Sequence, residues 1–134
     1  MQKRLLQFSG FSAAISVSLG ALAAHGLKSK LETGLITETN LQSFDTAARY
    51  QMYHSIALLV MALLIEKFHT KLISSAAYCF MTGIVLFSGS IYILSTARLL
   101  GLENVQWLGP VTPIGGLLFV FGWILLAFAG MKQK

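Results

Sequence analysis

The sequence predicts an all-α integral membrane protein whose four helices cross a bilayer as an up-down bundle. Only 11% of the residues are charged, whereas a soluble domain carries about 25%. The hydrocarbon core of a bilayer is roughly 30 Å thick, and a helix needs about 20 apolar residues to cross it. Four uncharged stretches approach or exceed that length, at 5–24, 50–65, 72–97 and 105–131. We therefore expect one four-helix domain over residues 1–134.

The first helix is expected over about 5–27, with Gly26 as its stop signal. The basic start at Met1–Arg4 and the small residues at Ala21–Ala23 also resemble a secretory signal peptide. Glycine and serine interrupt the apolar run, however. This interruption favours a retained membrane helix over the compact apolar core of a signal peptide.

The second helix is expected over about 40–67, where Thr39 and Gln42 have the spacing of a capping box. Its first turns, 40–49, have one apolar face and are interpreted as an amphipathic lead-in at the membrane surface. At 1.5 Å per residue this helix would be about 42 Å long. Because that length exceeds the hydrocarbon core, we expect the start of the helix to protrude or tilt.

The third and fourth helices are expected over about 71–98 and 111–131, the third after a tight turn at 66–70. Pro113 fits the first turn of the fourth helix, and Trp107 fits an anchor at the membrane surface. Small residues recur every seven positions on each helix, which predicts close backbone contacts and little room for a central pore. These repeats, with a four-residue ladder on the first helix, are Ala13 and Gly20; Ser12, Ser16, Gly20 and Ala24; Ala48, Ser55 and Ala62; Ala76, Gly83, Ser90 and Ala97; and Gly115, Gly122 and Ala129.

The basic residues predict that both termini lie on the cytoplasmic side. Four spans place both termini and the middle turn on one side, which then holds six basic residues and one acidic residue. The opposite side holds four of each kind. Cytoplasmic loops carry the excess of lysine and arginine, so the net charge of +5 reflects topology and not a nucleic-acid partner. The six basic residues are Lys3, Arg4, Lys67, Lys71, Lys132 and Lys134.

Polar residues outside the charged loops gather near the helix ends opposite the termini. Pairs four residues apart, such as Asp45 with Arg49 and Tyr50 with His54, share a helix face. Ionisable groups within a membrane are candidate functional sites. Two interpretations stay open, a structural network that ties the helix ends together and a binding site. The candidate cluster comprises His25, Asp45, Arg49, Tyr50, Tyr53, His54, Ser88, Ser90, Tyr92 and Thr112.

Three classes of function are compatible with this cluster. The first is a non-enzymatic accessory or scaffold protein, or one that binds a lipid-like ligand; its partners would be the bilayer and, through small-residue faces, a second copy or a larger membrane complex. The second is a redox or quinone-linked protein in which His25 and His54 hold haem or copper. The third, a small-solute channel or carrier, is disfavoured by the tight packing and by the lack of a carboxylate near mid-membrane.

Enzyme signatures are missing from the sequence. There is no nucleotide-binding loop, no Gly-x-Ser-x-Gly elbow and no zinc-protease motif, so we assign no catalytic residue. Cys79 is the single cysteine and lies within an apolar run, where it is interpreted as a small buried hydrophobic residue. The chain is therefore expected to be a membrane protein without catalytic activity.

Four motifs occur in order along nearly the whole chain: GALAAHGL at 20–27, FDTAARYQMYH at 44–54, LFSGSIY at 86–92 and TPIGG at 112–116. Together they resemble the YgdD/YwdK-like family of small bacterial membrane proteins, a domain of unknown function (423) whose eukaryotic relatives are of the transmembrane protein 256 type. The resemblance implies a four-helix, multi-pass protein of the bacterial inner membrane. It implies no established reaction, and its motifs contain the residues of the candidate cluster.

Overall fold

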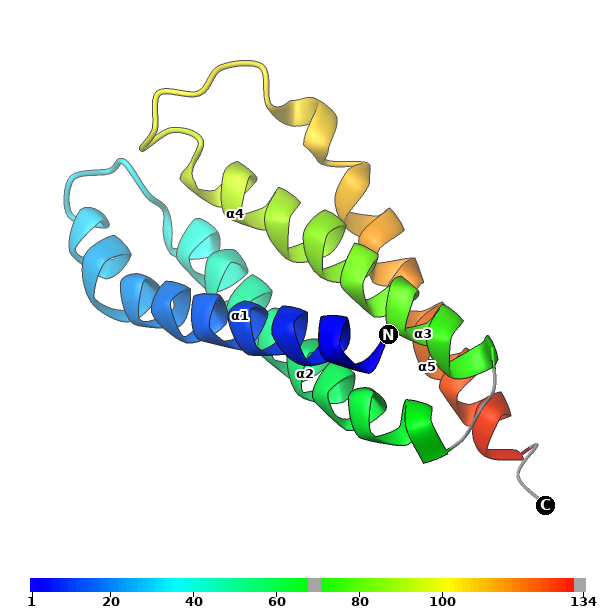
Figure 1. Cartoon of the computed structure of the whole chain (residues 1–134). Coiled ribbons are helices and arrows are strands. Elements are labelled where there is room, and N and C mark those ends of the chain that lie inside the picture. Colours follow the sequence, from blue (N-terminus) through cyan, green and yellow to red (C-terminus); the bar gives the residue numbers. More distant parts are fainter. Residues whose placement is uncertain (68–70, 132–134) are drawn as a thin grey trace.

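The structure, a computed structural model, describes residues 1–67 and 71–131, and the regular elements in these ranges are all helical (Figure 1). Within these ranges, four helices are long and apolar enough to cross a membrane, at Gln2–Lys30, Glu38–Lys67, Lys71–Thr96 and Gln106–Met131. The predicted all-α architecture with four membrane-spanning helices is therefore confirmed. The predicted turn at 66–70 falls partly outside the described residues, and Lys132 and Lys134 fall wholly outside them.

Two of the spans are interrupted by turns of π-helix. The first span consists of α1 (Gln2–Ala21), the π-helical η1 (Leu22–Leu27) and the short 3₁₀ helix η2 (Lys28–Lys30). The second is the single helix α2 (Glu38–Lys67). The third consists of α3 (Lys71–Gly83), the π-helical η3 (Ile84–Ser88) and α4 (Gly89–Thr96). The fourth consists of the 3₁₀ helix η4 (Gln106–Leu108) and α5 (Val111–Met131).

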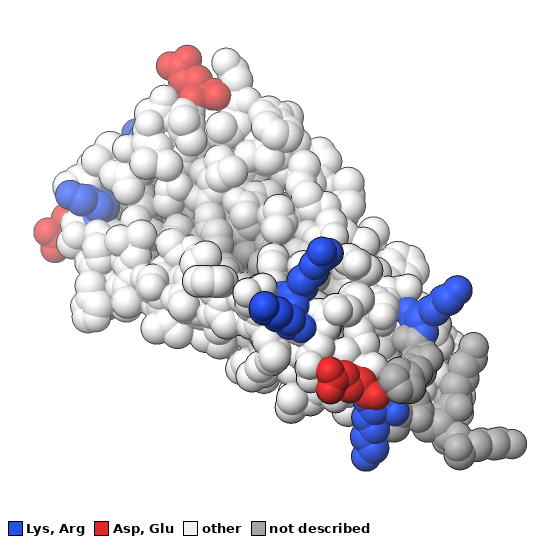
Figure 2. Space-filling model, viewed as in Figure 1, with Lys and Arg blue, Asp and Glu red and all other residues white. Residues whose placement is uncertain are grey.

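Successive spans run in opposite directions (Figure 1). The connections at 31–37 and 97–105 lie together at one end of the bundle, which we call the loop end. Away from the loop end, Leu5 of α1 shares a buried cluster with Ile73 of α3 and Ala129 of α5. The start of α1 and the end of α5 therefore lie toward the same end. Figure 2 shows charges gathered toward the two ends of the visible face, with an uncharged band between them.

The first span does not end at Gly26, contrary to the prediction. The chain stays helical through η1 and η2 as far as Lys30. It leaves the helix near Gly34, whose φ of 68° lies in the left-handed region that favours glycine, and whose N–H donates to the Leu31 carbonyl over 3.0 Å. Two glycines eight positions apart could each end this helix, and the backbone conformation that distinguishes them is not visible in the sequence.

The second span is capped by Thr37, and the predicted capping box at Thr39 was wrong. The backbone N–H of Asn40 donates to Oγ1 of Thr37 over 3.1 Å, and the Thr37 hydroxyl donates to Oδ1 of Asn40. Such a side chain satisfies an N–H of the first turn that has no helical partner. Because α2 begins at Glu38, Thr39 lies inside the helix and its side chain is free to line a surface.

Close packing of α3 and η3 against α5 depends on glycine. A Cβ atom built on Gly83 would lie 2.6 Å from the ring of Phe119, and one built on Gly115 would lie 2.8 Å from Cα of Phe87. Helices that approach this closely gain dispersion contacts that lipid tails cannot replace. The small-residue repeats therefore do form a seam between these two spans. On α1 the pattern is only partly used, because a Cβ on Gly20 would have no heavy atom within 4 Å.

Candidate functional site

A buried polar network joins the first three spans around Gln51. Its amide nitrogen donates to the carbonyl oxygen of Ser12 on α1 over 3.0 Å, and its amide oxygen accepts from the hydroxyl of Tyr92 on α4 over 2.8 Å. Oγ of Ser55, one turn further along α2, is hydrogen-bonded to Oγ of Ser12 over 2.7 Å. Gln51, Ser55 and Ser12 are all buried. One glutamine side chain thus connects α1 to α4 through α2.

Two adjacent backbone carbonyls of α2 extend this network. Ser16 of α1 donates to the carbonyl oxygen of Ala48 over 2.7 Å, and Ser88 of η3 donates to that of Ala47 over 2.9 Å. A carbonyl oxygen that already accepts a helical hydrogen bond keeps a second lone pair for such a donor. No water is present in the hydrocarbon core to satisfy these hydroxyls. The two bonds therefore fix how α1 and η3 are rotated against α2.

A groove between α1 and the third span brings part of this network to the surface. We call it the α1–α4 groove, and its volume is about 340 Å³. Ser12, Gln51 and Tyr92 contribute its polar groups, while the remaining side chains are apolar. Phe11 and Val85 are 73% and 60% exposed, so the groove opens on the outer surface of the bundle. The lining residues are Phe8, Phe11, Ser12, Ile15, Leu19, Gln51, Ile84, Val85, Gly89 and Tyr92.

The groove is open because α1 is not packed closely against the third span and because one lining residue is a glycine. α1 packs chiefly on α2 and makes few contacts with the third span. Gly89 leaves further room, because a Cβ built there would have no heavy atom within 4 Å. Ile84 and Val85 come from the π-helical turn η3, a type of distortion that occurs frequently at functional sites.

His54 lies in an aromatic enclosure formed with α3 and α5. Its ring stacks on Phe119 with the centroids 3.5 Å apart and an interplanar angle of 11°, and it meets the edge of Phe80 at 5.1 Å. Nδ1 lies 2.7 Å from the carbonyl oxygen of Tyr50, and Nε2 accepts from the indole N–H of Trp123 over 3.2 Å. Both ring nitrogens of this buried histidine therefore have protein partners.

The two histidines considered as haem or copper ligands lie in different surroundings. His25 is exposed in η1, whose neighbouring residues Ala23 and Leu27 pack against Phe44 near the start of α2. His54 lies about 15 Å beyond Phe44 along the α2 axis. Within residues 1–67 and 71–131, no group of three or more His, Cys, Asp and Glu side chains could hold a metal ion. The fold does not bring the two histidines together as a ligand pair.

Asp45, Arg49 and Tyr53 form part of the exposed face of α2. Asp45 and Arg49 make an ion pair of 2.5 Å, with side chains 40% and 66% exposed, and Tyr53 follows one turn later with 56% exposed. The Tyr50 side chain does not belong to this face. Its ring packs against that of Phe87 in η3, with the centroids 5.1 Å apart. The ion pair thus sits on the surface of the bundle and is not part of the buried network around Gln51.

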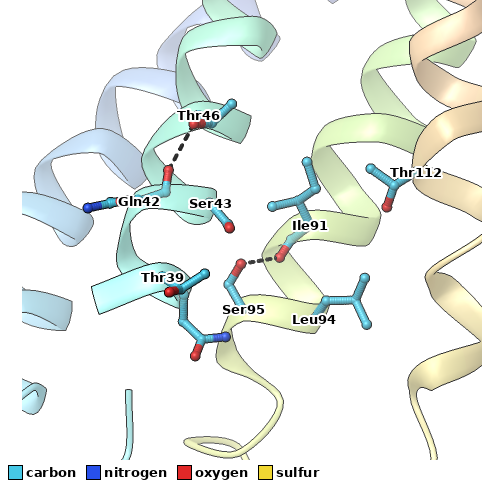
Figure 3. A pocket seen from close by; sticks show the side chains of 9 residues that line it. Thr39, Gln42, Ser43, Thr46, Ile91, Leu94, Ser95 and Thr112 are labelled. Atoms are coloured by element: carbon cyan, nitrogen blue, oxygen red, sulfur yellow. Dashed lines mark hydrogen bonds between the residues drawn. The ribbon is translucent and has the colours of Figure 1, made fainter. Parts of the chain in front are cut away.

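Ser90 and Thr112 join the third and fourth spans near the loop end. Their hydroxyl oxygens lie 2.7 Å apart, and Ser90 also donates to the carbonyl oxygen of Phe87 over 3.0 Å. Because a hydroxyl has a single proton, Thr112 is the donor in this pair. Thr112 also lines a second cavity between α2 and α4, of about 520 Å³, which Figure 3 shows from close by. We call this cavity the hydroxyl cleft; its lining residues are Thr39, Asn40, Gln42, Ser43, Thr46, Ile91, Leu94, Ser95 and Thr112.

The candidate cluster therefore divides into separate groups. Tyr92 and Ser88 belong to the buried network, and Tyr50 and His54 belong to the aromatic enclosure. Asp45, Arg49 and Tyr53 form an exposed face, and His25 lies in an exposed turn. Ser90 bonds to Thr112, which lines the hydroxyl cleft. Sequence reasoning missed Gln51 and Trp123. The available signal was that each is a polar-tipped residue within an otherwise apolar run. Ser12 and Ser55 were interpreted as packing positions alone.

Comparison with known proteins decides the family. The family model described as "Protein of unknown function (DUF423)" matches residues 19–116. The chain belongs to the DUF423 family. The UPF0382 membrane protein YwdK of Bacillus subtilis is 37% identical over 131 residues, covering 97% of this chain and 98% of YwdK. A UPF0382 membrane protein of Haemophilus influenzae is 39% identical and covers 100% of this chain and 98% of its own length.

The DUF423 relatives extend beyond the matched core of the family. A UPF0382 membrane protein of Staphylococcus aureus is 36% identical over 97% of both chains. An alignment of this length takes in most of α1 before residue 19 and most of α5 after residue 116, and these two parts supply Ser12 and Trp123. No solved structure matches the chain. The resemblance found in the four motifs is confirmed, and this DUF423 protein is a membrane protein of a bacterial family.

Proposed function

We propose that this DUF423 protein is a non-enzymatic protein of the bacterial inner membrane that binds a lipid-like ligand in the α1–α4 groove. One observation carries the proposal: a lipid-facing groove has apolar walls and, on its floor, the amide of Gln51 bonded to the phenol of Tyr92. An amphipathic molecule pairs an apolar chain with a polar group, and the groove offers a surface for each part.

The hydrogen-bond donors on the groove floor are already engaged. The Gln51 amide nitrogen donates to the carbonyl oxygen of Ser12 and, over 3.3 Å, to its Oγ, and the Tyr92 hydroxyl donates to Gln51. Lone pairs remain on the Gln51 amide oxygen and on the Tyr92 hydroxyl oxygen. The floor therefore suits a ligand that donates hydrogen bonds, such as a lipid with a free hydroxyl. A quinone carries only carbonyl acceptors and fits this floor less well.

The depth of the floor suits a ligand in one leaflet. Gln51 lies about 24 Å before Lys67 along the α2 axis, within a hydrocarbon core of roughly 30 Å and nearer the loop end. If the termini are cytoplasmic, as the basic residues predict, the floor lies in the outer leaflet. The bound polar group would then be near the outer membrane surface, and its chain would follow the groove inward.

Filling the groove tests the proposal. Gly89→Leu places an isobutyl group in open space within the groove, and Gly20→Leu makes the same change at an open position of α1 outside it. Each variant would be purified in mild detergent, and lipids extracted from it would be measured by mass spectrometry. We expect a hydroxyl-bearing lipid to co-purify with the wild type and Gly20→Leu and to fall about tenfold in Gly89→Leu.

Two results would contradict ligand binding in the groove. One is a set of extracted lipids that merely mirrors the bulk membrane for all three proteins. The other is equal retention by Gly89→Leu and Gly20→Leu. Tyr92→Phe adds a second test, because it removes the acceptor oxygen without changing the ring. It should weaken retention of a hydroxyl-bearing lipid more than that of its methyl ether.

The proposed orientation has its own test. In a Cys79→Ser background, Thr33→Cys places a thiol in the exposed connection at the loop end, and Lys3→Cys places one near the N-terminus. A membrane-impermeant maleimide should label Thr33→Cys in intact cells and label Lys3→Cys only after permeabilisation. The reverse pattern would place the termini outside and the groove floor in the inner leaflet.

A further inference from the structure

The hydroxyl cleft differs in chemistry from the α1–α4 groove. Seven of its nine lining residues are uncharged and polar, none is ionisable, and Ile91 and Leu94 supply the apolar part. In Figure 3, Ser43 points from α2 into the space between α2 and α4, and Thr112 borders the cleft from α5. Gln42 points away toward the first span, where it also lines a cavity with Ala23 and Ala24 of η1.

The hydroxyl protons of three lining residues are engaged inside the protein. Thr46 donates to the carbonyl oxygen of Gln42 over 2.9 Å, and Ser95 donates to that of Ile91 over 2.6 Å (Figure 3). Thr112 donates to Ser90, because the single hydroxyl proton of Ser90 is already donated to the carbonyl oxygen of Phe87. Each of the three oxygens keeps lone pairs that can accept further hydrogen bonds. The cleft thus presents several acceptors from three spans and suits a ligand with several donors.

The absence of charge on the lining narrows the ligand class. A phosphate or carboxylate would need Lys or Arg to offset the loss of its hydration, and neither residue type lines the cleft. A metal ion or an ammonium group would need a carboxylate to offset the loss of its hydration, and no carboxylate lines the cleft. A neutral polyol needs neither a basic residue nor a carboxylate in the lining. The volume of about 520 Å³ is within the range of sites that hold small molecules.

We propose that the hydroxyl cleft binds a neutral, hydroxyl-rich group of the size of a sugar, held by the oxygens of Thr46, Ser95 and Thr112. The same chemistry could come from the head group of a glycolipid or from a soluble sugar. The cleft lies at the loop end, where the first turns of α2 meet the end of α4, and this position is close to a membrane surface. The inference is independent of the α1–α4 groove, whose lining shares no residue with the cleft.

The test compares lipids that differ only in the sugar. The full chain would be reconstituted in phosphatidylcholine nanodiscs containing equal amounts of monoglucosyl diacylglycerol and diacylglycerol, and retained lipid would be counted by native mass spectrometry. Thr46→Val/Thr112→Val removes two acceptor oxygens while keeping side-chain shape. Thr96→Val is the matched control, because Thr96 donates to a helix carbonyl in the same way but does not line the cleft. Repeating the measurement in Gly89→Leu separates the cleft from the groove.

We expect the glucosyl lipid to be retained over diacylglycerol in the wild type, in Thr96→Val and in Gly89→Leu. The double variant should lower that preference about tenfold, since each neutral hydrogen bond changes binding by a few-fold. Soluble maltose that raises the melting temperature of the wild type, but not of the double variant, would identify a free sugar as the source. Equal retention of the two lipids with no effect of maltose would overturn the proposal. So would a preference that the double variant keeps.

Discussion

The indole N–H of Trp123 on α5 donates to Nε2 of His54 on α2, and this bond sets the tautomer of the histidine. Nε2 must be unprotonated to accept it. Nδ1 faces the carbonyl oxygen of Tyr50 at 2.7 Å, and a carbonyl can only accept. The proton of the neutral ring therefore resides on Nδ1. His54 then links one turn of its own helix to the fourth span.

The tautomer is the first prediction. In protein labelled with ¹⁵N-histidine, the His54 signals should report a protonated Nδ1 and an unprotonated Nε2. Trp123→Phe removes the donor and should shift the Nε2 resonance, whereas Trp107→Phe, at a 68% exposed position in η4, should leave it in place. A proton on Nε2 in the wild type, or equal responses to both substitutions, would show that the two side chains are not bonded.

Neighbouring glycines of α5 should respond in opposite ways to alanine. A Cβ on Gly115 would lie 2.8 Å from Cα of Phe87, and backbone atoms cannot move aside as a flexible side chain can. A Cβ on Gly116 would lie 3.7 Å from the Phe87 ring, an ordinary contact. Gly115→Ala should lower the free energy of unfolding by about 1–3 kcal/mol. Gly116→Ala should be neutral or stabilising, because alanine favours helix by up to about 1 kcal/mol.

Thermal unfolding in detergent measures both variants under identical conditions. A Gly115→Ala protein as stable as Gly116→Ala would mean that α5 and η3 are further apart than described here.

The bond between Gln51 and Tyr92 should appear as a coupling energy. Gln51→Leu leaves the Tyr92 hydroxyl and a Ser12 carbonyl without their partner, and Tyr92→Phe removes only the hydroxyl. A double-mutant cycle should therefore give a favourable interaction of about 0.6–1.7 kcal/mol, as for hydrogen bonds between other membrane helices. Unfolding by denaturing detergent gives the four free energies. Strictly additive effects of the two substitutions would exclude the bond.

Arg49→Ala should have little effect on stability. The sequence placed Arg49 in a candidate cluster that would either tie the helix ends together or form a binding site. Its partner is Asp45 on the same helix, however, and its side chain is 66% exposed. Exposed pairs four residues apart contribute about 0.3–0.5 kcal/mol. The melting temperature in detergent should change less for Arg49→Ala than for Gln51→Leu. A larger loss for Arg49→Ala would show that the arginine has a second role, such as anchoring at the membrane surface.

The four spans could be predicted because the bilayer imposes their length and composition. A run such as 72–97 has no charge, and hydrocarbon leaves a helix as the way to satisfy its backbone. The spacing of Gly83 and Gly115 on two helices also indicated packing seams correctly. It did not indicate which helices pair, because seven-residue repeats occur on all four spans and the contact between η3 and α5 is a property of the whole fold.

Local backbone details were not predictable to the same degree. Thr37 and Thr39 each precede a residue that can complete a cap, and the choice between them depends on where Ile36 packs in the cluster beside Phe44. The π-helical turns η1 and η3 have no signature in spacing or composition. A π-helical turn lets the helix axis continue, but it changes which of the following residues face a neighbouring helix.

The sequence drew attention to polar residues near the loop end, but it did not indicate which of them bond to one another. Charge drew attention to Arg49 and His25, which are exposed, whereas the uncharged Gln51 makes the bonds between spans. Its partners Ser12 and Tyr92 are 39 and 41 positions away, so no local pattern records them. Serine on a membrane helix is common as a packing residue, and its hydrogen bonding appears only when the opposite helix is in place.

The pairing of α1 with α2 has a consequence for the order in which the protein is made. A ribosome synthesises the first two spans before the third, and they can meet in the membrane as a hairpin at once. Ser16 and Ser55 would find their hydrogen-bond partners on the opposite helix at that stage, but the amide oxygen of Gln51 would still lack the Tyr92 hydroxyl. The newly inserted hairpin would therefore carry an unpaired hydrogen-bond acceptor within the hydrocarbon core. When α4 inserts, its Tyr92 hydroxyl would pair with this acceptor. The Gln51 amide thus marks the position on the first two spans at which the second half of the chain docks.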